Sequence, residues 1–267
     1  MEDIMSEKMA LGVQLYSLHP FMKDEKCFRM VMERVADIGY KYVQVSALGN
    51  VAPEVIKEEA DKNGLEVVLT HWSPDALRND TDKAIADHNV FGCNAIGIGG
   101  LYIYGTGGCS GVSFEAYDKF HAEFTPIIEK IKAAGKTFVY HNHRFEFARH
   151  NGKLDIVYLL EQNPDVKLVF DTYWAQSGGY DPALFIKQYG ERIHTVHLKD
   201  MKIVRDVQKF TEILDGNLNF DSIMDACLEK KIKYLMVEQD ETDLEDRFTS
   251  VKRSYNNLME RYGDILK

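Results

Sequence analysis

Three ionisable side chains stand at the end of one short stretch of the chain. The segment "YHNHRFEF", residues 140–147, contains His141, His143 and Glu146 directly after Thr-Phe-Val. If the stretch is a β-strand, His141 and His143 lie on the same face, and Glu146 follows where the chain could turn it back inward. A buried strand does not hold three such groups without partners. The segment therefore predicts that the strand opens onto a polar cavity.

The same residue types recur at the ends of three later apolar stretches. Asp171 ends "VKLVFD", His197 lies in "IHTVHLKD" and Glu238 lies in "YLMVEQD". Alternation within "IHTVHLKD" places His194 and His197 on opposite faces, with His197 at the strand end. Histidine nitrogens and carboxylate oxygens that converge suit a divalent cation such as Mn²⁺, Mg²⁺, Co²⁺ or Zn²⁺. We therefore expect a metal site.

Each of these residues also has an ordinary structural explanation. A single histidine at a strand end often serves only as a hydrogen-bonding group, and Asp171 could simply cap the following helix. Their shared position favours a metal site, because Glu146, Asp171, His197 and Glu238 all lie at the same end of successive predicted strands.

Polar and aromatic residues at other strand ends predict a substrate pocket around this site. The expected substrate-binding residues are Gln14, Tyr16, His71, Trp174 and Lys199. For Trp174, simple packing beneath a loop is an equal alternative. Lys199 and Arg144 could meet a phosphate, although basic residues on such loops are ordinarily solvated.

Eight short apolar stretches alternate with polar, helix-like ones, which indicates how these residues are positioned. Five of them follow a glycine just past a helix, where the left-handed conformation favours glycine; these are Gly39, Gly64, Gly92, Gly135 and Gly190. Eight strands joined by helical crossovers in this length predict a (β/α)₈ barrel, whose strand ends meet at one mouth. An open sheet with fewer strands is the alternative.

Composition narrows the classes of function. The chain has 267 residues, of which 45% are hydrophobic, so we expect one barrel domain over residues 1–267. A net charge of −10 disfavours nucleic acid as a partner. No apolar run is long enough to span a bilayer, and the amino terminus lacks the pattern of a secretory signal, so we expect a cytoplasmic protein without a membrane partner.

The motifs "YHNHRFEF", "FDTYW", "HLKD" and "VEQD", in this order, resemble the sugar phosphate isomerase/epimerase family of xylose isomerase-like TIM barrels. The resemblance covers essentially the whole chain. It implies a divalent-metal enzyme of carbohydrate metabolism, an isomerase or epimerase acting on a sugar, sugar phosphate or keto sugar. The implied chemistry is proton transfer next to a carbonyl through a metal-stabilised enediolate.

The resemblance also implies particular metal ligands. Asp171, His197 and Glu238 correspond to three ligands of the family, and Glu238 is expected to act in catalysis as well. Gln44 departs from the family pattern, because relatives often carry glutamate at this position. No additional carboxylate is therefore expected from that strand.

The fourth implied ligand comes from the strand of "YHNHRFEF". Many relatives carry an acid within this strand, where Tyr140 or His141 stands here. A related pattern with His-Asn-His carries its acid three residues later, so we expect Glu146 to be the ligand. His141 and His143 would then be catalytic bases, or one of them would join the coordination sphere.

Other activities stay open at this point. The motifs also resemble relatives that act on 3-keto sugars, in which β-elimination would make the protein a lyase or hydrolase of 3-keto-glycosides. A non-catalytic sugar-binding barrel is another alternative, and assembly into a homo-oligomer is left open. An apurinic endonuclease is disfavoured, because the chain is acidic and lacks the additional ligands of a three-metal cluster.

Overall fold

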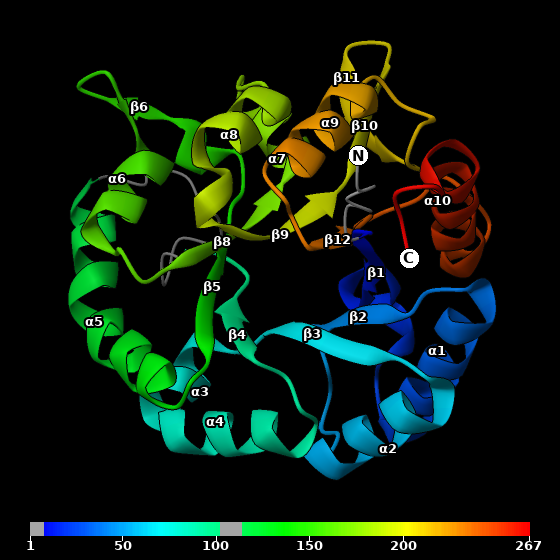
Figure 1. The fold of residues 1–267 in the computed structure, drawn as a ribbon, viewed down its shortest axis with the longest axis horizontal. Helices are drawn as coiled ribbons and strands as arrows, with labels where there is room; N and C mark the ends of the chain where they lie inside the picture. The colour runs from blue at the N-terminus through cyan, green and yellow to red at the C-terminus, as the bar shows by residue number, and fades with distance from the viewer. Residues whose placement is uncertain (1–7, 102–113) are drawn as a thin grey trace, which may run out of the picture.

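The computed structural model describes residues 8–101 and 114–267 and contains a closed barrel of eight parallel strands (Figure 1). Their order around the barrel is β1, β12, β9, β8, β5, β4, β3 and β2, so every strand is paired on both sides. This closure confirms the predicted (β/α)₈ class and excludes the open sheet. The strands are β1 (Ala10–Gln14), β2 (Tyr42–Val45), β3 (Glu66–His71), β4 (Ala95–Ile98), β5 (Thr137–His141), β8 (Lys167–Asp171), β9 (Ile193–Leu198) and β12 (Tyr234–Val237).

Helices surround the barrel and connect its strands (Figure 1). The α-helices are α1 (Glu25–Ile38), α2 (Pro53–Asn63), α3 (Pro74–Asn79), α4 (Thr81–Val90), α5 (Phe114–Ala133), α6 (Asp155–Gln162), α7 (Thr172–Ser177), α8 (Pro182–Tyr189), α9 (Phe220–Glu229) and α10 (Arg247–Tyr262). Short 3₁₀ turns are η1 (Leu15–Phe21), η2 (Phe145–Phe147) and η3 (Gly190–Arg192), and two small hairpins pair β6 (Arg149–His150) with β7 (Lys153–Leu154) and β10 (Asp200–Val204) with β11 (Val207–Thr211).

Local sequence explains where a typical helix of the outer layer begins and which face it buries. Asp24 precedes α1 and accepts a hydrogen bond from the backbone N–H of Cys27, which satisfies one of the free amides of the first turn. The buried residues of α1 are spaced three and four apart, so one stripe packs on the barrel; they are Phe28, Val31, Met32 and Val35.

The glycines that end the helices behave largely as predicted. Gly39, Gly64, Gly92 and Gly135 all have positive φ angles, of 120°, 64°, 72° and 74°. The prediction is wrong for Gly190, whose φ is −53° because the chain continues into η3 without a left-handed residue. A side chain there would meet Lys230, since a Cβ atom would lie 2.6 Å from that residue's Cβ.

Two inward-facing layers of the barrel lead from the core to the mouth. The apolar layer includes Leu69, Ala95, Val139, Val169 and Met236. Side chains alternate along a strand, so the residue two positions further on faces inward at the next level. That level is almost entirely polar and consists of His71, Gly97, His141, Asp171 and Glu238, joined by Gln14, Gln44 and His197 of β1, β2 and β9. The sequence period of the strands thus places the ionisable residues in one ring.

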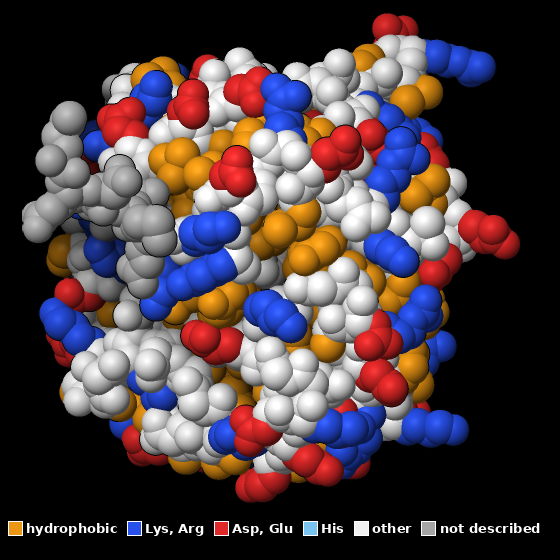
Figure 2. All heavy atoms as spheres, turned by 45° about the vertical axis from the view of Figure 1, so that its right-hand side comes forward, with side chains coloured by type: hydrophobic (Ala, Val, Ile, Leu, Met, Phe, Trp, Pro, Cys, Tyr) orange, Lys and Arg blue, Asp and Glu red, His pale blue; other side chains and the backbone are white. Residues whose placement is uncertain are grey.

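The outer surface shows no large area of one charge on the face drawn in Figure 2, where acidic and basic side chains are interspersed. Some charged side chains pair across helices, as Lys130 of α5 does with Asp82 of α4 at 2.7 Å. Within residues 8–101 and 114–267, no helix has the length and apolarity needed to cross a membrane.

We predict that Gly97→Ala lowers the free energy of unfolding by about 3 kcal/mol, because the barrel interior leaves no room for a methyl group. A Cβ atom at Gly97 would overlap the Val139 side chain and lie 2.6 Å from its carbonyl oxygen. Gly64→Ala is the control, since Gly64 has a φ of 64° but open space around it, and this change should cost about 1 kcal/mol. Urea unfolding measures both, and equal losses would contradict the packing argument.

Candidate metal centre

Four buried side chains at the barrel mouth direct donor atoms at a common point. One ligand atom each from His141, Asp171, His197 and Glu238 lies within 4.8 Å of the others. Nδ1 of His197 is 2.9 Å from Oε2 of Glu238 and 3.9 Å from Oδ2 of Asp171. Nε2 of His141 is 3.5 Å from Oδ2 of Asp171 and 3.8 Å from Oε2 of Glu238. The group joins the carboxyl ends of β5, β8, β9 and β12.

Hydrogen bonds on the outer side of each imidazole determine which nitrogen faces the centre with a lone pair. Nδ1 of His141 is 3.3 Å from the backbone oxygen of Gly99, and Nε2 of His197 is 2.7 Å from Oε1 of Gln44. Gln44 is oriented by its amide nitrogen, which donates to Ser46 Oγ at 3.4 Å. Because both outer partners are acceptors, the outer nitrogens carry the protons, and the inner nitrogens are free to bind a cation.

Asp171 combines the two roles that its position in the sequence left open. Its Oδ1 accepts a hydrogen bond of 2.8 Å from the backbone N–H of Trp174, so it caps α7. Its Oδ2 is buried without a hydrogen-bond partner and faces the two histidines. One oxygen therefore serves the helix, and the other is available to a ligand.

Lys199 lies beside the centre and compensates part of its negative charge. Its side chain is 1% exposed, and its ammonium group lies 3.3 Å from Oε2 of Glu238 and 2.8 Å from both carboxylate oxygens of Asp240. Burial alone would raise the pKa of Glu238, but the neighbouring Lys199 and His197 side chains hold this pKa well below its ordinary value. Glu238 is therefore ionised at neutral pH.

The donor set fits a divalent cation. Two imidazole lone pairs and two carboxylate oxygens facing one another in a buried cavity repel unless a positive charge lies between them. Nε2 of His141 and Oδ2 of Asp171 have no hydrogen-bond partner although both are buried. Ligands about 2.1 Å from a common ion lie about 3.0 Å apart when adjacent and about 4.2 Å apart when opposite. The four separations between a histidine nitrogen and a carboxylate oxygen, 2.9–3.9 Å, lie close to or between these two values.

The structure does not place Glu146, the strand-five ligand expected from the sequence, in this group. Glu146 lies in η2, beyond the end of β5, and is fully buried. Its two oxygens accept hydrogen bonds from the Tyr140 hydroxyl at 2.6 Å and from the backbone N–H of His143 at 2.7 Å. Burial raises its pKa to about 8. His141 takes the strand-five position instead, and Glu146 holds the turn that follows it.

His143 and Trp174 lie together at the rim of the centre. The His143 ring contacts the rings of His141 at 4.8 Å and Trp174 at 5.4 Å between centroids. Nδ1 of His143 and Nε1 of Trp174 are both buried and lack hydrogen-bond partners. Burial lowers the pKa of His143 well below its ordinary value, so this ring is neutral. Both side chains can therefore exchange hydrogen bonds with a bound molecule.

His71 offers a hydrogen-bond donor on the opposite side of the centre. The backbone N–H of Tyr16 donates to Oε1 of Gln14 at 3.2 Å, so the amide nitrogen of Gln14 is the atom directed at Nδ1 of His71, 3.5 Å away. The ring proton of His71 is thereby assigned to Nε2, which is buried and has no partner. The predicted residues Gln14, Tyr16 and His71 thus form one connected group beside the metal ligands.

Phosphate binding by Lys199 or Arg144 is not supported by the geometry. The Lys199 ammonium is surrounded by carboxylates and contacts the rings of Trp174 and Phe210 at 5.2 Å and 4.9 Å. Arg144 is exposed at the turn after β5.

The role of Gln44 was not predictable from the sequence. Its contact with His197 joins strands more than 150 residues apart in sequence.

The two histidines of β9 lie at opposite ends of that strand. His197 is fully buried at the mouth, whereas His194 stacks on Tyr234 at 5.5 Å between ring centroids and is 2.8 Å from Thr195 Oγ1. The pairing register shifts here, since Ile193 pairs with Leu168 and Thr195 pairs with Val169. His194 is therefore the extra residue of a β-bulge, which strict alternation does not describe.

Comparisons with known proteins identify a family for this chain and relatives that share its fold. Residues 32–257 match the family model described as "Xylose isomerase-like TIM barrel". An inosose dehydratase of Clostridium perfringens is 24% identical over 257 residues, which cover 83% of this chain and 85% of that protein. A sugar phosphate isomerase/epimerase of Parabacteroides distasonis superposes with a TM-score of 0.78 at 22% identity, covering 99% of this chain and 97% of that one. A probable 3-DHS dehydratase from Bacillus anthracis superposes with a TM-score of 0.72 at 14% identity, covering 95% and 100%.

We predict that Asp171→Asn removes most of the bound divalent ion and leaves the fold intact. The amide oxygen can still accept the Trp174 N–H, so the cap of α7 survives, whereas the charge that faces His141 and His197 is lost. Elemental analysis after purification, beside a thermal unfolding curve, tests this. Wild-type metal content in the variant would remove Asp171 from the site.

A second prediction separates the two candidates for the strand-five ligand. His141→Ala should reduce divalent metal content at least tenfold, whereas Glu146→Gln should retain it, because Glu146 is occupied by Tyr140 and His143. Titration with Mn²⁺ after chelation measures both affinities. The opposite outcome would mean that Glu146 reaches the cation and that His141 only supports it.

Proposed function

Because the chain belongs to the xylose isomerase-like TIM barrel family, we propose that it is a divalent-metal-dependent enzyme that transfers a proton next to the carbonyl of a keto sugar or ketopolyol. The observation that carries the proposal is the convergence of four buried donor atoms, of which Nε2 of His141 and Oδ2 of Asp171 have no other partner. The structural relatives named as a sugar phosphate isomerase/epimerase, an L-ribulose 3-epimerase and a D-allulose 3-epimerase support a sugar as the substrate.

His141, Asp171, His197 and Glu238 would hold the ion. When bound, a divalent ion such as Mn²⁺ or Co²⁺ acts there as a Lewis acid toward substrate oxygens. The mixture of imidazole and carboxylate ligands suits Mn²⁺, Co²⁺ and Zn²⁺, and Mg²⁺ less well, because Mg²⁺ prefers oxygen.

Glu238 is the residue best placed to take the proton. Its contact with Nδ1 of His197 and its hydrogen bond from Lys199 both use Oε2, which leaves Oε1 for a substrate C–H group. Its pKa is held low, so the carboxylate is in the form that a general base requires. Lys199 keeps this carboxylate in place through its bonds to Glu238 and Asp240.

Two neutral histidines would assist on either side. His71 presents a donor N–H at Nε2, which can hold a substrate hydroxyl or stabilise oxygen as charge develops on it. His143, neutral and without a partner at Nδ1, can accept a hydroxyl proton or return a proton to carbon. The site therefore contains the groups needed for reversible removal and return of an α-proton.

The fate of the resulting enediolate distinguishes two activities. Return of the proton gives an isomer or epimer, which is the activity we propose first. Loss of a leaving group from the β-carbon gives an elimination, and the inosose dehydratase of Clostridium perfringens favours this second candidate. Both begin with the same proton removal.

We predict that the Mn²⁺-loaded protein exchanges the α-proton of at least one cyclic keto sugar or inosose with solvent deuterium, as followed by NMR. Glu238→Gln, assayed at saturating Mn²⁺, should reduce exchange at least a hundredfold because the general base is lost. Recovery of an epimer indicates the first activity, and appearance of an unsaturated product indicates elimination.

His194→Ala is the matched control, since His194 lies at the opposite end of β9 from the centre. It should retain both metal and exchange and lose only stability. A metal-loaded protein that binds sugars without exchanging any proton across this panel would favour a non-catalytic sugar-binding barrel.

A further inference from the structure

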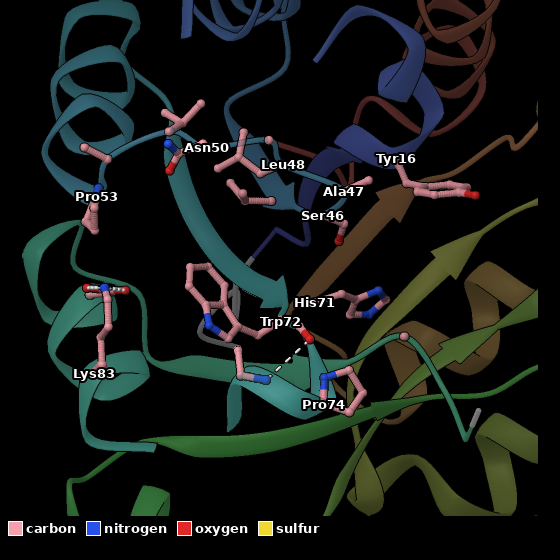
Figure 3. A pocket seen from close by; sticks show the side chains of 18 residues that line it. Tyr16, Ser46, Ala47, Leu48, Asn50, Pro53, His71, Trp72, Pro74 and Lys83 are labelled. Carbon is pink, nitrogen blue, oxygen red and sulfur yellow. Dashed lines mark hydrogen bonds and ion pairs between the residues drawn. The ribbon is translucent and has the colours of Figure 1, made fainter. Parts of the chain in front are cut away.

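A groove opens beside the metal centre, between the loops that follow β2 and β3. Its volume is about 630 Å³, which falls in the range of pockets that bind drug-sized ligands. The walls are mainly apolar and include Leu48, Val51, Trp72, Pro74 and Ala76. In Figure 3, Tyr16 and His71 lie at one side, Pro53 and Lys83 lie at the other, and Trp72 lies between them.

The groove and the metal centre share a wall. His71 lines the groove, and its ring centroid is 5.2 Å from that of His141 and 5.9 Å from that of His197. Tyr16 stands at the same end, with 39% of its surface exposed. A molecule held at the metal ligands could therefore extend directly into the groove.

The described walls of the groove offer no free positive charge to a phosphate group. Lys83, the cation among the described lining residues, pairs at 2.7 Å with Asp87, which also lines the groove. At the inner end, the Lys199 ammonium is held between the Glu238 and Asp240 carboxylates. A phosphate group would therefore compete with Asp87 for Lys83, and with Glu238 and Asp240 for Lys199.

Trp72 is held rigidly within this apolar wall. Its backbone N–H donates to the carbonyl oxygen of Gly97 at 2.7 Å, and its ring meets His88 edge-on at 5.0 Å. Both nitrogens of His88 are engaged, with Thr70 Oγ1 and with the Ala84 carbonyl, each at 2.7 Å. The indole is thus positioned before any ligand arrives, which lowers the entropy cost of stacking against a flat group.

We propose that this groove binds an apolar, ring-sized substituent of the substrate, so that the substrate is a keto sugar carrying an aryl group and not a free or phosphorylated sugar. The inference rests on the proposed function for the position of the keto sugar at the metal ligands. Continuity through His71, the apolar walls and the paired state of Lys83 together select this chemistry.

The chain contains two tryptophans, Trp72 and Trp174, which allows a direct binding test. In Trp174→Phe, Trp72 is the remaining indole and reports on the groove. The Mn²⁺-loaded variant is titrated with phenyl β-D-glucopyranoside, methyl β-D-glucopyranoside and glucose 6-phosphate. The phenyl compound should change the fluorescence of Trp72 and bind at least tenfold more tightly than the methyl compound.

Ala76→Phe in the same background should fill the groove and abolish the preference for the phenyl compound, while binding of the methyl compound stays unchanged. Leu48→Ser, which removes an apolar wall without adding volume, should reduce the preference several-fold if Ala76→Phe fails to fold. Equal affinity for the phenyl and methyl compounds in the Trp174→Phe protein overturns the proposal. Tighter binding of glucose 6-phosphate, lost in Lys83→Met, overturns it in favour of a phosphate site.

Metal content and deuterium exchange, measured on wild-type protein in parallel, keep this test separate from the proposed function. Phenyl-selective binding without exchange on any keto sugar supports the groove and contradicts the enzyme. Exchange on a free keto sugar without any phenyl preference supports the enzyme and contradicts the groove.

Discussion

Lone pairs that face one another in a buried cavity require a positive charge between them, and the mouth of this barrel is built around that requirement. Gly99 and Gln44 assign the protons of the neutral His141 and His197 rings to their outer nitrogens, so the inner nitrogens of these neutral rings present lone pairs. One carboxylate oxygen each of Asp171 and Glu238 lies 2.9–3.9 Å from these inner nitrogens. The helix cap at Asp171 and the Lys199 bridge fix these acceptors in place, so the centre is rigid before a cation binds.

Much of this arrangement follows from the strand period. Once the sequence indicates eight parallel strands, the carboxyl ends must share one mouth, and alternation then selects the inward residues. The apolar residues Val139, Val169 and Met236 each precede an ionisable residue by two positions, and this pattern brings His141, Asp171 and Glu238 into one ring. The closed barrel and the meeting of these residues were therefore predictable from the sequence.

The structure differs from the sequence-based expectations at residues that lie outside regular strand alternation. Glu146 follows β5 by five residues, and the turn η2 directs it to the Tyr140 hydroxyl, a contact that spacing alone does not indicate. His194 sits in a bulge that breaks alternation, and Gly190 leads into a 3₁₀ turn. Gln44 meets His197 only because the barrel closes between distant strands. Each of these depends on tertiary geometry and not on local propensity.

Charge compensation at the mouth has a consequence for how molecules reach it. Two ligand carboxylates would be neutralised by one divalent ion, and Lys199 is matched by Asp240 at 2.8 Å. The loaded site would therefore carry almost no net charge and project little field into solvent. Capture of a substrate would then depend on short-range contacts with the groove and the mouth, and its association rate would respond only weakly to ionic strength, unlike that of enzymes that steer charged substrates over long distances.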